Sequence, residues 1–283
     1  MPTLRAFAMV LAFVGLTLVS IPVQYVAVRF KLKGLRNYAR RYQRGLCWLF
    51  GIRITVLGTP VRDRAVLMVA NHTGYFDVVI MGATVDVSFV AKSEVSGWPF
   101  FGMMARLQRS VFIERDRRSR SGAARDVLRE RLLAGDGLVL FPEGTSTDGN
   151  RVLPFKSALM GAVETDIGTD EKGQKIYAPV QPVSISYVAL HGMPLGRENR
   201  PLFAWYGDMD LLPHVWEALK AGPLDVIVEF HPPLTVGPGC GRKQIAVAAE
   251  AIVREGQRRA LSGDWGGLNR DGAGENSPAE AAA

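Results

Sequence analysis

The amino-terminal part of this 283-residue chain lacks acidic residues, since no aspartate or glutamate occurs before Asp63. The same stretch, residues 1–62, carries ten lysines and arginines, whereas the rest of the chain has 24 basic and 27 acidic residues. The formal charge of +7 therefore arises at the front of the chain. Nucleic-acid-binding domains more often spread basic residues over the folded domain, so this distribution disfavours a nucleic-acid partner.

Motifs of several large enzyme classes are also absent. The chain has no G-x-S-x-G elbow, no Walker phosphate loop, no G-x-G-x-x-G after a strand and no Cys/His pattern with zinc spacing. Serine hydrolases, P-loop NTPases, dinucleotide-binding dehydrogenases and zinc enzymes are therefore disfavoured. Only two cysteines occur, Cys47 and Cys240, which favours free thiols in a reducing compartment.

One long apolar run is present, the 23 uncharged residues 6–28. As a helix it would measure about 34 Å, enough for a bilayer core of about 30 Å. Both a transmembrane span and one half of a hairpin fit, with Pro22 as a point of kinking. A signal peptide is disfavoured because a basic block follows the run instead of a small-residue cleavage site. That block, residues 29–44, predicts an inner-membrane protein whose remaining chain lies on the cytoplasmic side.

Residues 34–50 show apolar side chains at helical spacing, with Arg36, Arg40, Arg41 and Arg44 largely on other faces. The pattern predicts an amphipathic helix in the headgroup layer, with Tyr42 and Leu46 facing lipid. An ordinary surface helix packed on the domain is the alternative. Residues 1–50 are thus predicted to form membrane-anchoring helices.

Short apolar runs alternate with helical stretches from residue 52 onward. This pattern predicts an α/β fold, a mixed sheet flanked by helices, in one domain over residues 51–261. The predicted strands are 52–57, 66–70, 88–91, 110–113, 137–141, 178–187, 202–206 and 224–230. The predicted helices are 77–83, 99–107, 119–134, 156–164, 211–221 and 242–261. The small, polar residues 262–283 are predicted to be a disordered tail.

The most suggestive polar motif is N-H-T-G-Y-F-D, which directly follows the predicted strand 66–70. Ligand sites of α/β sheets lie at the carboxyl ends of strands. If His72 lies in the turn and Asp77 in the first helical turn, Asp77 can accept from one ring nitrogen and leave the other as a base. A helix-capping turn with an incidental histidine is the alternative. Backbone N–H groups at this helix start are candidate oxyanion donors.

Two further motifs also end predicted strands. F-P-E-G-T places Glu143 at a loop mouth, with Gly144 permitting a tight turn, although a solvated turn explains the same residues. V-F-I-E-R places Arg115 where a guanidinium suits a phosphate or carboxylate, although a solvated charged face is the alternative. A fourth segment, V-Q-P-V, contains Pro182 and is predicted to be structural.

In this order, the four blocks N-H-T-G-Y-F-D, V-F-I-E-R, F-P-E-G-T and V-Q-P-V resemble those of the 1-acyl-sn-glycerol-3-phosphate (lysophosphatidate) acyltransferase family. The resemblance covers roughly residues 50–235 and implies a glycerolipid acyltransferase-like fold. It implies that His72 is the catalytic base with Asp77 as its partner. It also implies that the acyl acceptor is held by four residues, namely Arg115, Glu143, Gly144 and Thr145.

This chain departs from the family pattern in two places. Ser146 stands where an arginine usually follows F-P-E-G-T, and Arg109 stands where a glycine usually opens the second block. The stretches F-P-E-G-T-S-T-D-G-N-R and A-W-Y-G-D-M-D resemble the lyso-ornithine lipid O-acyltransferase subgroup. Both lyso-ornithine lipid and 1-acylglycerol-3-phosphate therefore remain candidate acceptors.

The resemblance implies a role in membrane lipid biosynthesis, by transfer of an acyl group from a thioester to a lyso-lipid hydroxyl. The implied partners are membrane lipids, the acceptor, and acyl carrier protein or coenzyme A as the carrier of the acyl group. The thioester is a co-substrate, and no cofactor or metal is expected. Without a serine or cysteine elbow, direct transfer is expected instead of an acyl-enzyme. The competing hypothesis is a non-catalytic protein that binds anionic lipid through residues 1–50.

Overall fold

The structure is a computed structural model that describes residues 2–30, 32, 37–62, 64–113, 121–164, 166–169, 171–237 and 240–264. The sequence-predicted acceptor ligand Arg115 lies outside these residues, as do residues 265–283 of the predicted tail.

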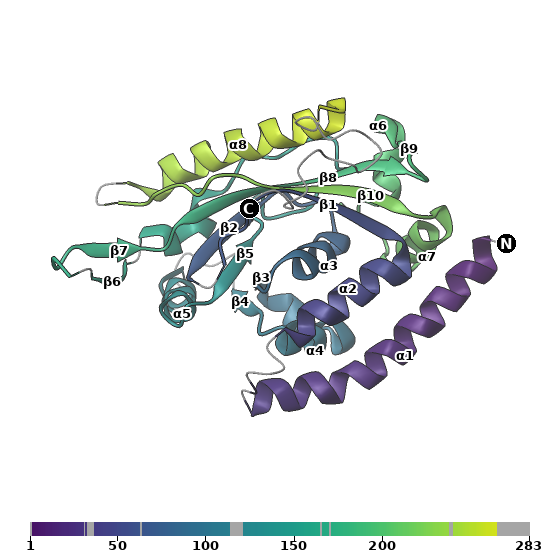
Figure 1. Ribbon diagram of the computed structural model, residues 1–283, viewed down its shortest axis with the longest axis horizontal. Coiled ribbons are helices and arrows are strands. Elements are labelled where there is room, and N and C mark those ends of the chain that lie inside the picture. Colours follow the sequence, from purple (N-terminus) through teal and green to yellow (C-terminus); the bar gives the residue numbers. More distant parts are fainter. Residues whose placement is uncertain are drawn as a thin grey trace, which may run out of the picture.

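The chain folds into a sheet with helices on both sides (Figure 1). The helices described are α1 (Pro2–Arg29), α2 (Tyr38–Phe50), α3 (Tyr75–Thr84), α4 (Pro99–Leu107), α5 (Ser121–Leu133), α6 (Gly196–Asn199), α7 (Leu211–Ala221) and α8 (Arg242–Ser262), with 3-10 segments η2 (Ser93–Gly97), η4 (Ser157–Glu164) and η5 (Arg200–Leu202). The strands described are β1 (Ile52–Gly58), β2 (Val66–Ala70), β3 (Ser88–Lys92), β4 (Val111–Ile113), β5 (Gly137–Leu140), β6 (Asp166–Thr169), β7 (Lys175–Tyr177), β8 (Val180–Leu190), β9 (Met193–Pro194) and β10 (Leu224–Phe230). The predicted mixed α/β class is confirmed.

The main sheet has the order β1-β10-β8-β2-β5-β3-β4, with β9 paired to β8. Its pairs are parallel except for β10 with β8 and β8 with β9. The central strands β2 and β5 run side by side, with Val69 opposite Leu140. Their carboxyl ends therefore emerge at the same edge, which brings the loops after β2 and β5 together.

Strand β2 is buried along its whole length because both faces of the sheet are covered. Val66, Met68 and Ala70 belong to a core with α2, α3 and α7. Leu67 and Val69 point to the other face and pack in a core with α5, η4 and α8. In Figure 1, α8 covers one face of the sheet and α3 the other. A strand buried on both faces reads as a continuous apolar run, which is why V-L-M-V-A lacks alternation.

Helix α1 is long and apolar enough, by length and composition, to cross a membrane. It also lies along the domain and is fixed at three levels. Near its start, Arg5 Nη2 donates to Leu219 O of α7 (2.9 Å). In its middle, Thr17 Oγ1 and Tyr42 OH lie 2.7 Å apart. Near its end, Gln24 Nε2 donates to Leu107 O of α4 (2.9 Å).

The outward face of α1 carries exposed apolar side chains, which include Leu4, Phe7, Leu11, Val14, Leu18 and Val19. An exposed apolar face on this helix indicates membrane association.

The prediction that Tyr42 and Leu46 of α2 face lipid is wrong. Both side chains are buried, and Leu46 lies next to Cys47, which belongs to the core under α3. Arg44 Nε donates to Ala83 O of α3 (3.0 Å), so this guanidinium contacts protein as well. Helix α2 therefore packs on the domain, as the alternative interpretation held, because its apolar side chains find partners on α1 and α3.

The predicted element order differs from the structure in several places. The short elements η2, β9 and α6 were not predicted, and the predicted helix 156–164 is the 3-10 segment η4. The predicted strand 202–206 is instead the end of η5 followed by an extended loop, in which the Trp205 amide bonds to the loop after β2 and not to a strand. The hairpin β6–β7 was not predicted, because its strands of four and three residues are too short to show periodicity.

Candidate active site

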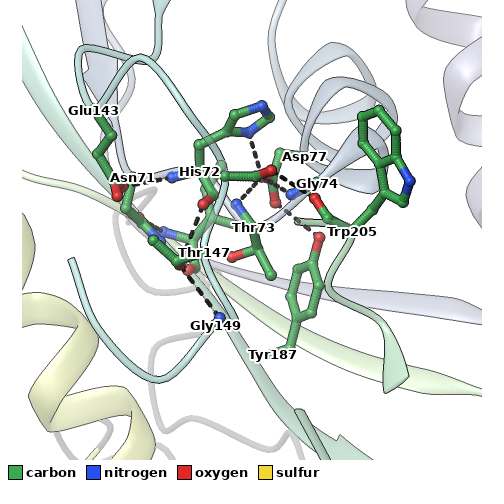
Figure 2. Close-up of polar contacts among 12 residues, drawn as sticks. Asn71, His72, Thr73, Gly74, Asp77, Glu143, Thr147, Gly149, Tyr187 and Trp205 are labelled. Carbon is green, nitrogen blue, oxygen red and sulfur yellow. Dashed lines mark hydrogen bonds and ion pairs between the residues drawn. The ribbon is translucent and has the colours of Figure 1, made fainter. Parts of the chain in front are cut away.

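The loop after β2 places His72 and Asp77 in direct contact. His72 Nδ1 lies 2.8 Å from Asp77 Oδ2, as expected from the spacing (Figure 2). Asp77 is the third residue of α3, and Gly74 is the residue before the helix. The contact fixes the proton on Nδ1, since a carboxylate can only accept. Among the residues that the structure describes, none bonds to the other ring nitrogen, Nε2.

Asp77 is fully buried and its carboxylate is bonded on both oxygens. In addition to His72, Oδ2 accepts from the backbone N–H groups of Thr73 (2.6 Å) and Gly74 (2.9 Å). An anion at the first turn of a helix is also favoured by the helix dipole. These donors compensate the burial of a charge and hold the carboxylate in one orientation.

The other oxygen of Asp77 is bound by Tyr187, a residue that sequence reasoning missed. Tyr187 OH donates to Asp77 Oδ1 at 2.8 Å, across 110 residues of sequence. Burial raises the pKa of the Tyr187 hydroxyl, and the nearby charge of Asp77 raises it further, so the hydroxyl remains a donor. Only the pairing of β8 beside β2 brings the two together, and no motif in the sequence marks Tyr187.

The F-P-E-G loop is joined to the His72 loop through Glu143. The Glu143 side chain is buried; Oε1 accepts from the His72 backbone N–H (2.8 Å) and Oε2 from that of Leu153 (3.0 Å). Burial raises the pKa of the Glu143 carboxyl to about 8, although the two backbone donors lower it. The Glu143 carboxyl group therefore joins its own loop to the His72 loop and to the segment at Leu153.

The ring of His72 is held by an aromatic stacking contact as well as by the contact with Asp77. Phe141 stacks on it with ring centroids 4.2 Å apart and an interplanar angle of 17°. The His72 side chain remains 24% exposed, so the ring is not closed off from a substrate. Phe141 is buried and directly follows β5, so the parallel pair β2–β5 sets this stacking.

A third loop, the one predicted as a strand, completes the wall of the site. The Trp205 backbone N–H donates to Thr73 O (3.0 Å), and Ser146 Oγ donates to Trp205 O (2.5 Å). A Cβ on Gly74 would lie 2.9 Å from Trp205 N, so only glycine permits this approach. Thr147 N also donates to His72 O (2.9 Å). Figure 2 shows Thr73, Thr147 and Trp205 around the His72 loop.

The remaining predicted site residues lie at different places. Gly144 adopts φ +74° in the F-P-E-G loop and Thr145 is exposed beside it. Pro182 lies in β8 opposite Val69, which is a structural position. Of the candidate oxyanion donors, the amides of Thr73 and Gly74 are already engaged by Asp77. Among the residues the structure describes, no cluster of three His, Cys, Asp or Glu side chains could hold a metal ion.

Comparison with known proteins assigns this geometry to a family. The family model described as Acyltransferase matches residues 53–186. A lyso-ornithine lipid O-acyltransferase from Brucella abortus is 45% identical over 92% of this chain and 97% of its own length. A protein of the same name from Rhizobium meliloti is 40% identical over 95% of this chain and 90% of its own length.

A solved structure extends the likeness to three dimensions. The crystal structure of the 1-acyl-sn-glycerophosphate acyltransferase from Thermotoga maritima matches with a TM-score of 0.61 and 25% identity, over 94% of this chain and 99% of that one. The comparisons give no support to the non-catalytic hypothesis. With relatives of 40–45% identity along most of its length, the chain belongs to the acyltransferase family and is an O-acyltransferase.

Proposed function

We propose that this enzyme acylates the free hydroxyl of a lyso-lipid, with His72 as general base and Asp77 as the residue that orients it. The observation that carries the proposal is the 2.8 Å contact of His72 Nδ1 with a buried carboxylate, together with an Nε2 to which no described residue bonds. A hydroxyl is a weak nucleophile until a base removes its proton. A neutral imidazole held in one tautomer is suited to that task.

The chemistry follows in two steps. His72 Nε2 takes the acceptor hydroxyl proton while the oxygen attacks the thioester carbonyl carbon. The tetrahedral intermediate then breaks its carbon–sulfur bond, and the imidazolium returns the proton to the departing thiolate. An ester and a free thiol result. Asp77 stabilises the imidazolium during this interval, while Glu143 holds the His72 backbone and Phe141 stacks on the ring.

The acceptor proposed is lyso-ornithine lipid, which would be converted to ornithine lipid. This choice is supported by the relatives of that name, which match over most of the chain at 40–45% identity. The relatives named 1-acyl-sn-glycerol-3-phosphate acyltransferase are more distant; one from Neisseria gonorrhoeae is 29% identical over 60% of this chain. 1-Acylglycerol-3-phosphate is the second candidate.

The donor proposed is acyl carrier protein or coenzyme A carrying the acyl thioester, and the location is the cytoplasmic side of the inner membrane. The basic residues that follow α1 support this orientation. The proposed organisation is an anchoring part (1–50), an acyltransferase domain (51–261) and a tail (262–283). Because acceptor and product are lipids, an enzyme seated at the bilayer avoids the cost of moving an acyl chain through water, about 0.8 kcal/mol per CH₂.

The acceptor is tested with the purified full chain in detergent. Lyso-ornithine lipid and lysophosphatidate are each supplied with acyl carrier protein and coenzyme A thioesters, and the products are identified by mass spectrometry. Acylation of lyso-ornithine lipid is the expected result. Acylation of lysophosphatidate alone would assign the second candidate, and no acylation of either would overturn the proposal.

The base is tested with His72→Ala. We expect kcat to fall by roughly 10²–10⁴-fold, because the proton acceptor is lost while the fold is kept. His191→Ala is the matched control, since His191 lies exposed in the turn after β8. Equal turnover by the two variants would remove His72 from the mechanism.

A further inference from the structure

Lys156 lies against the F-P-E-G loop although it follows Gly144 by twelve residues. Its backbone N–H donates to Pro142 O (2.9 Å), which closes the base of the loop. A Cβ built on Gly144 would lie 2.9 Å from Lys156 Nζ and 3.2 Å from its Cδ. The lysine side chain therefore runs along the open face of Gly144. Glycine at 144 serves both the left-handed backbone and the passage of this side chain.

The ammonium group of Lys156 has no acidic partner among the residues that the structure describes. The nearest acid in the loop, Glu143, uses both carboxylate oxygens on backbone N–H groups of His72 and Leu153. Lys156 is exposed, and its ammonium group has three N–H donors to offer.

Ser146, two residues after Gly144, already has a hydrogen-bond partner. Ser146 Oγ donates to Trp205 O and so holds the loop to the wall of the site. Lys156, which lies against this loop, therefore presents to a ligand at the loop mouth a cation that has no acidic partner among the described residues. The same loop carries Phe141, which stacks on His72, and Glu143, which bonds to the His72 backbone. The position of Lys156 is thus tied to that of the base.

We propose that Lys156 binds the anionic group of the acceptor head group and thereby sets acceptor specificity. The inference rests on the proposed function, since it names the ligand of the same site. The ligand chemistry is a carboxylate or phosphate attached to a lyso-lipid, and lyso-ornithine lipid supplies the carboxylate. With the anion on Lys156, the acceptor would lie across the F-P-E-G loop with its hydroxyl toward His72. A lysine contributes a point charge that suits either anion.

The test compares Lys156→Met, which keeps the apolar stem but removes the charge, with wild type and Lys156→Arg. For lyso-ornithine lipid we expect Lys156→Met to raise KM by roughly 10–100-fold, with kcat and the thioester KM little changed. Lys156→Arg should restore most of the affinity. Lys175→Met, on the β6–β7 hairpin, is the matched control for loss of one exposed lysine.

A second arm removes the charge from the ligand. The methyl ester of lyso-ornithine lipid should raise the wild-type KM by a similar factor and should cause little further rise in Lys156→Met. Lysophosphatidate in the same assays shows whether a phosphate is bound by the same lysine.

An unchanged acceptor KM in an active Lys156→Met would overturn the inference and leave the proposed function intact. A rise in the thioester KM alone would assign Lys156 to the donor and would also overturn it. If wild type acylates neither lipid, the proposed function itself fails, so the two failures are distinguishable.

Discussion

Two histidines in this protein stand beside a carboxylate, and their surroundings differ. His72 lies at the edge of the sheet, 2.8 Å from Asp77, and its second ring nitrogen has no partner in the described part of the chain. His231 is buried beneath α8, where its Nε2 lies 2.7 Å from Ser184 Oγ and its Nδ1 lies 3.5 Å from Glu229.

Ser184, His231 and Glu229 form a second group, which has the residue types of a serine–histidine–acid triad. Unlike a catalytic triad, this group is not accessible to a substrate. Ser184 Oγ also lies 3.0 Å from Val253 O of α8, and Glu229 is paired with Arg259. A Cβ on Gly256 would lie 2.3 Å from Ser184 Oγ, so no substrate can approach. Burial lowers the pKa of His231, which keeps the ring neutral. The comparison teaches that an acid–histidine contact becomes catalytic only where the second ring nitrogen can reach a substrate.

The largest difference between the two histidine sites is expected when the carboxylate beside each is removed, by Asp77→Asn and by Glu229→Gln. Asparagine at 77 would turn an amide toward groups that now donate to a carboxylate and would disturb the His72 tautomer. We expect kcat to fall by about 10²–10⁴-fold in Asp77→Asn, as for other histidine–aspartate pairs. Glu229→Gln should keep its kcat. Steady-state assays of the two proteins decide this, and a large loss in Glu229→Gln would give the second group a catalytic role.

Glu143, which joins the F-P-E-G loop to the His72 loop, should make the stability of the protein depend on pH. Glu143 has a pKa of about 8 in the folded protein, against 4.5 as its usual value. Between these values the folded state holds the proton more tightly, so the free energy of unfolding should fall as pH rises from 4.5 to 8 and then level off.

Glutamine at position 143 cannot titrate. The Glu143→Gln protein should therefore lack this pH-dependent fall in the free energy of unfolding, which is on the order of a few kcal/mol. Urea unfolding at a series of pH values measures it, and Glu198→Gln on the exposed helix α6 controls for the loss of one charge. An identical pH profile in Glu143→Gln and wild type would contradict the assigned cause.

Tyr187→Phe tests how much the hydrogen bond from Tyr187 contributes to holding the buried Asp77 carboxylate. Removing the hydroxyl leaves Asp77 Oδ1 without its donor, which should cost about 1–3 kcal/mol of stability and lower kcat. Thermal unfolding and kinetics are measured together, with the half-buried Tyr177→Phe of β7 as control. A Tyr187→Phe protein with wild-type kcat would show that the backbone donors alone orient Asp77.

Gly256→Ala tests the packing around Ser184 and His231, and its expected loss of stability is the smallest of these effects. The added methyl group must displace Ser184 or His231, at a cost of about 1–3 kcal/mol, offset by up to ~1 kcal/mol of helix propensity. Stability should therefore fall while activity stays. Gly161→Ala in η4 is the control, because its Cβ would meet only Arg242 at 3.9 Å. A loss of activity that exceeds the loss of folded protein would contradict the structural role.

Much of the fold followed from local patterns. The predicted segments 66–70, 99–107, 211–221 and 224–230 coincide with β2, α4, α7 and β10, because continuous apolar runs and helical periodicity are strong in them. The strand 202–206 failed because aromatic and apolar residues there serve a loop that bonds to Thr73 and Ser146. The lipid-facing assignment of α2 failed because periodicity identifies an apolar face but not what covers it.

The sequence by itself determined most of the strands and helices, the apolar amino-terminal helix, and the pairing of His72 with Asp77, since a five-residue separation across a helix start is a local geometry. Only the tertiary structure decided that Tyr187 holds the second oxygen of Asp77, that Glu143 bonds to the His72 loop, and that Lys156 lies along Gly144. These contacts join residues 12–110 positions apart, and their formation depends on which strands become neighbours in the sheet. Side-chain contacts at such separations follow from the packing of whole elements, which no local pattern encodes.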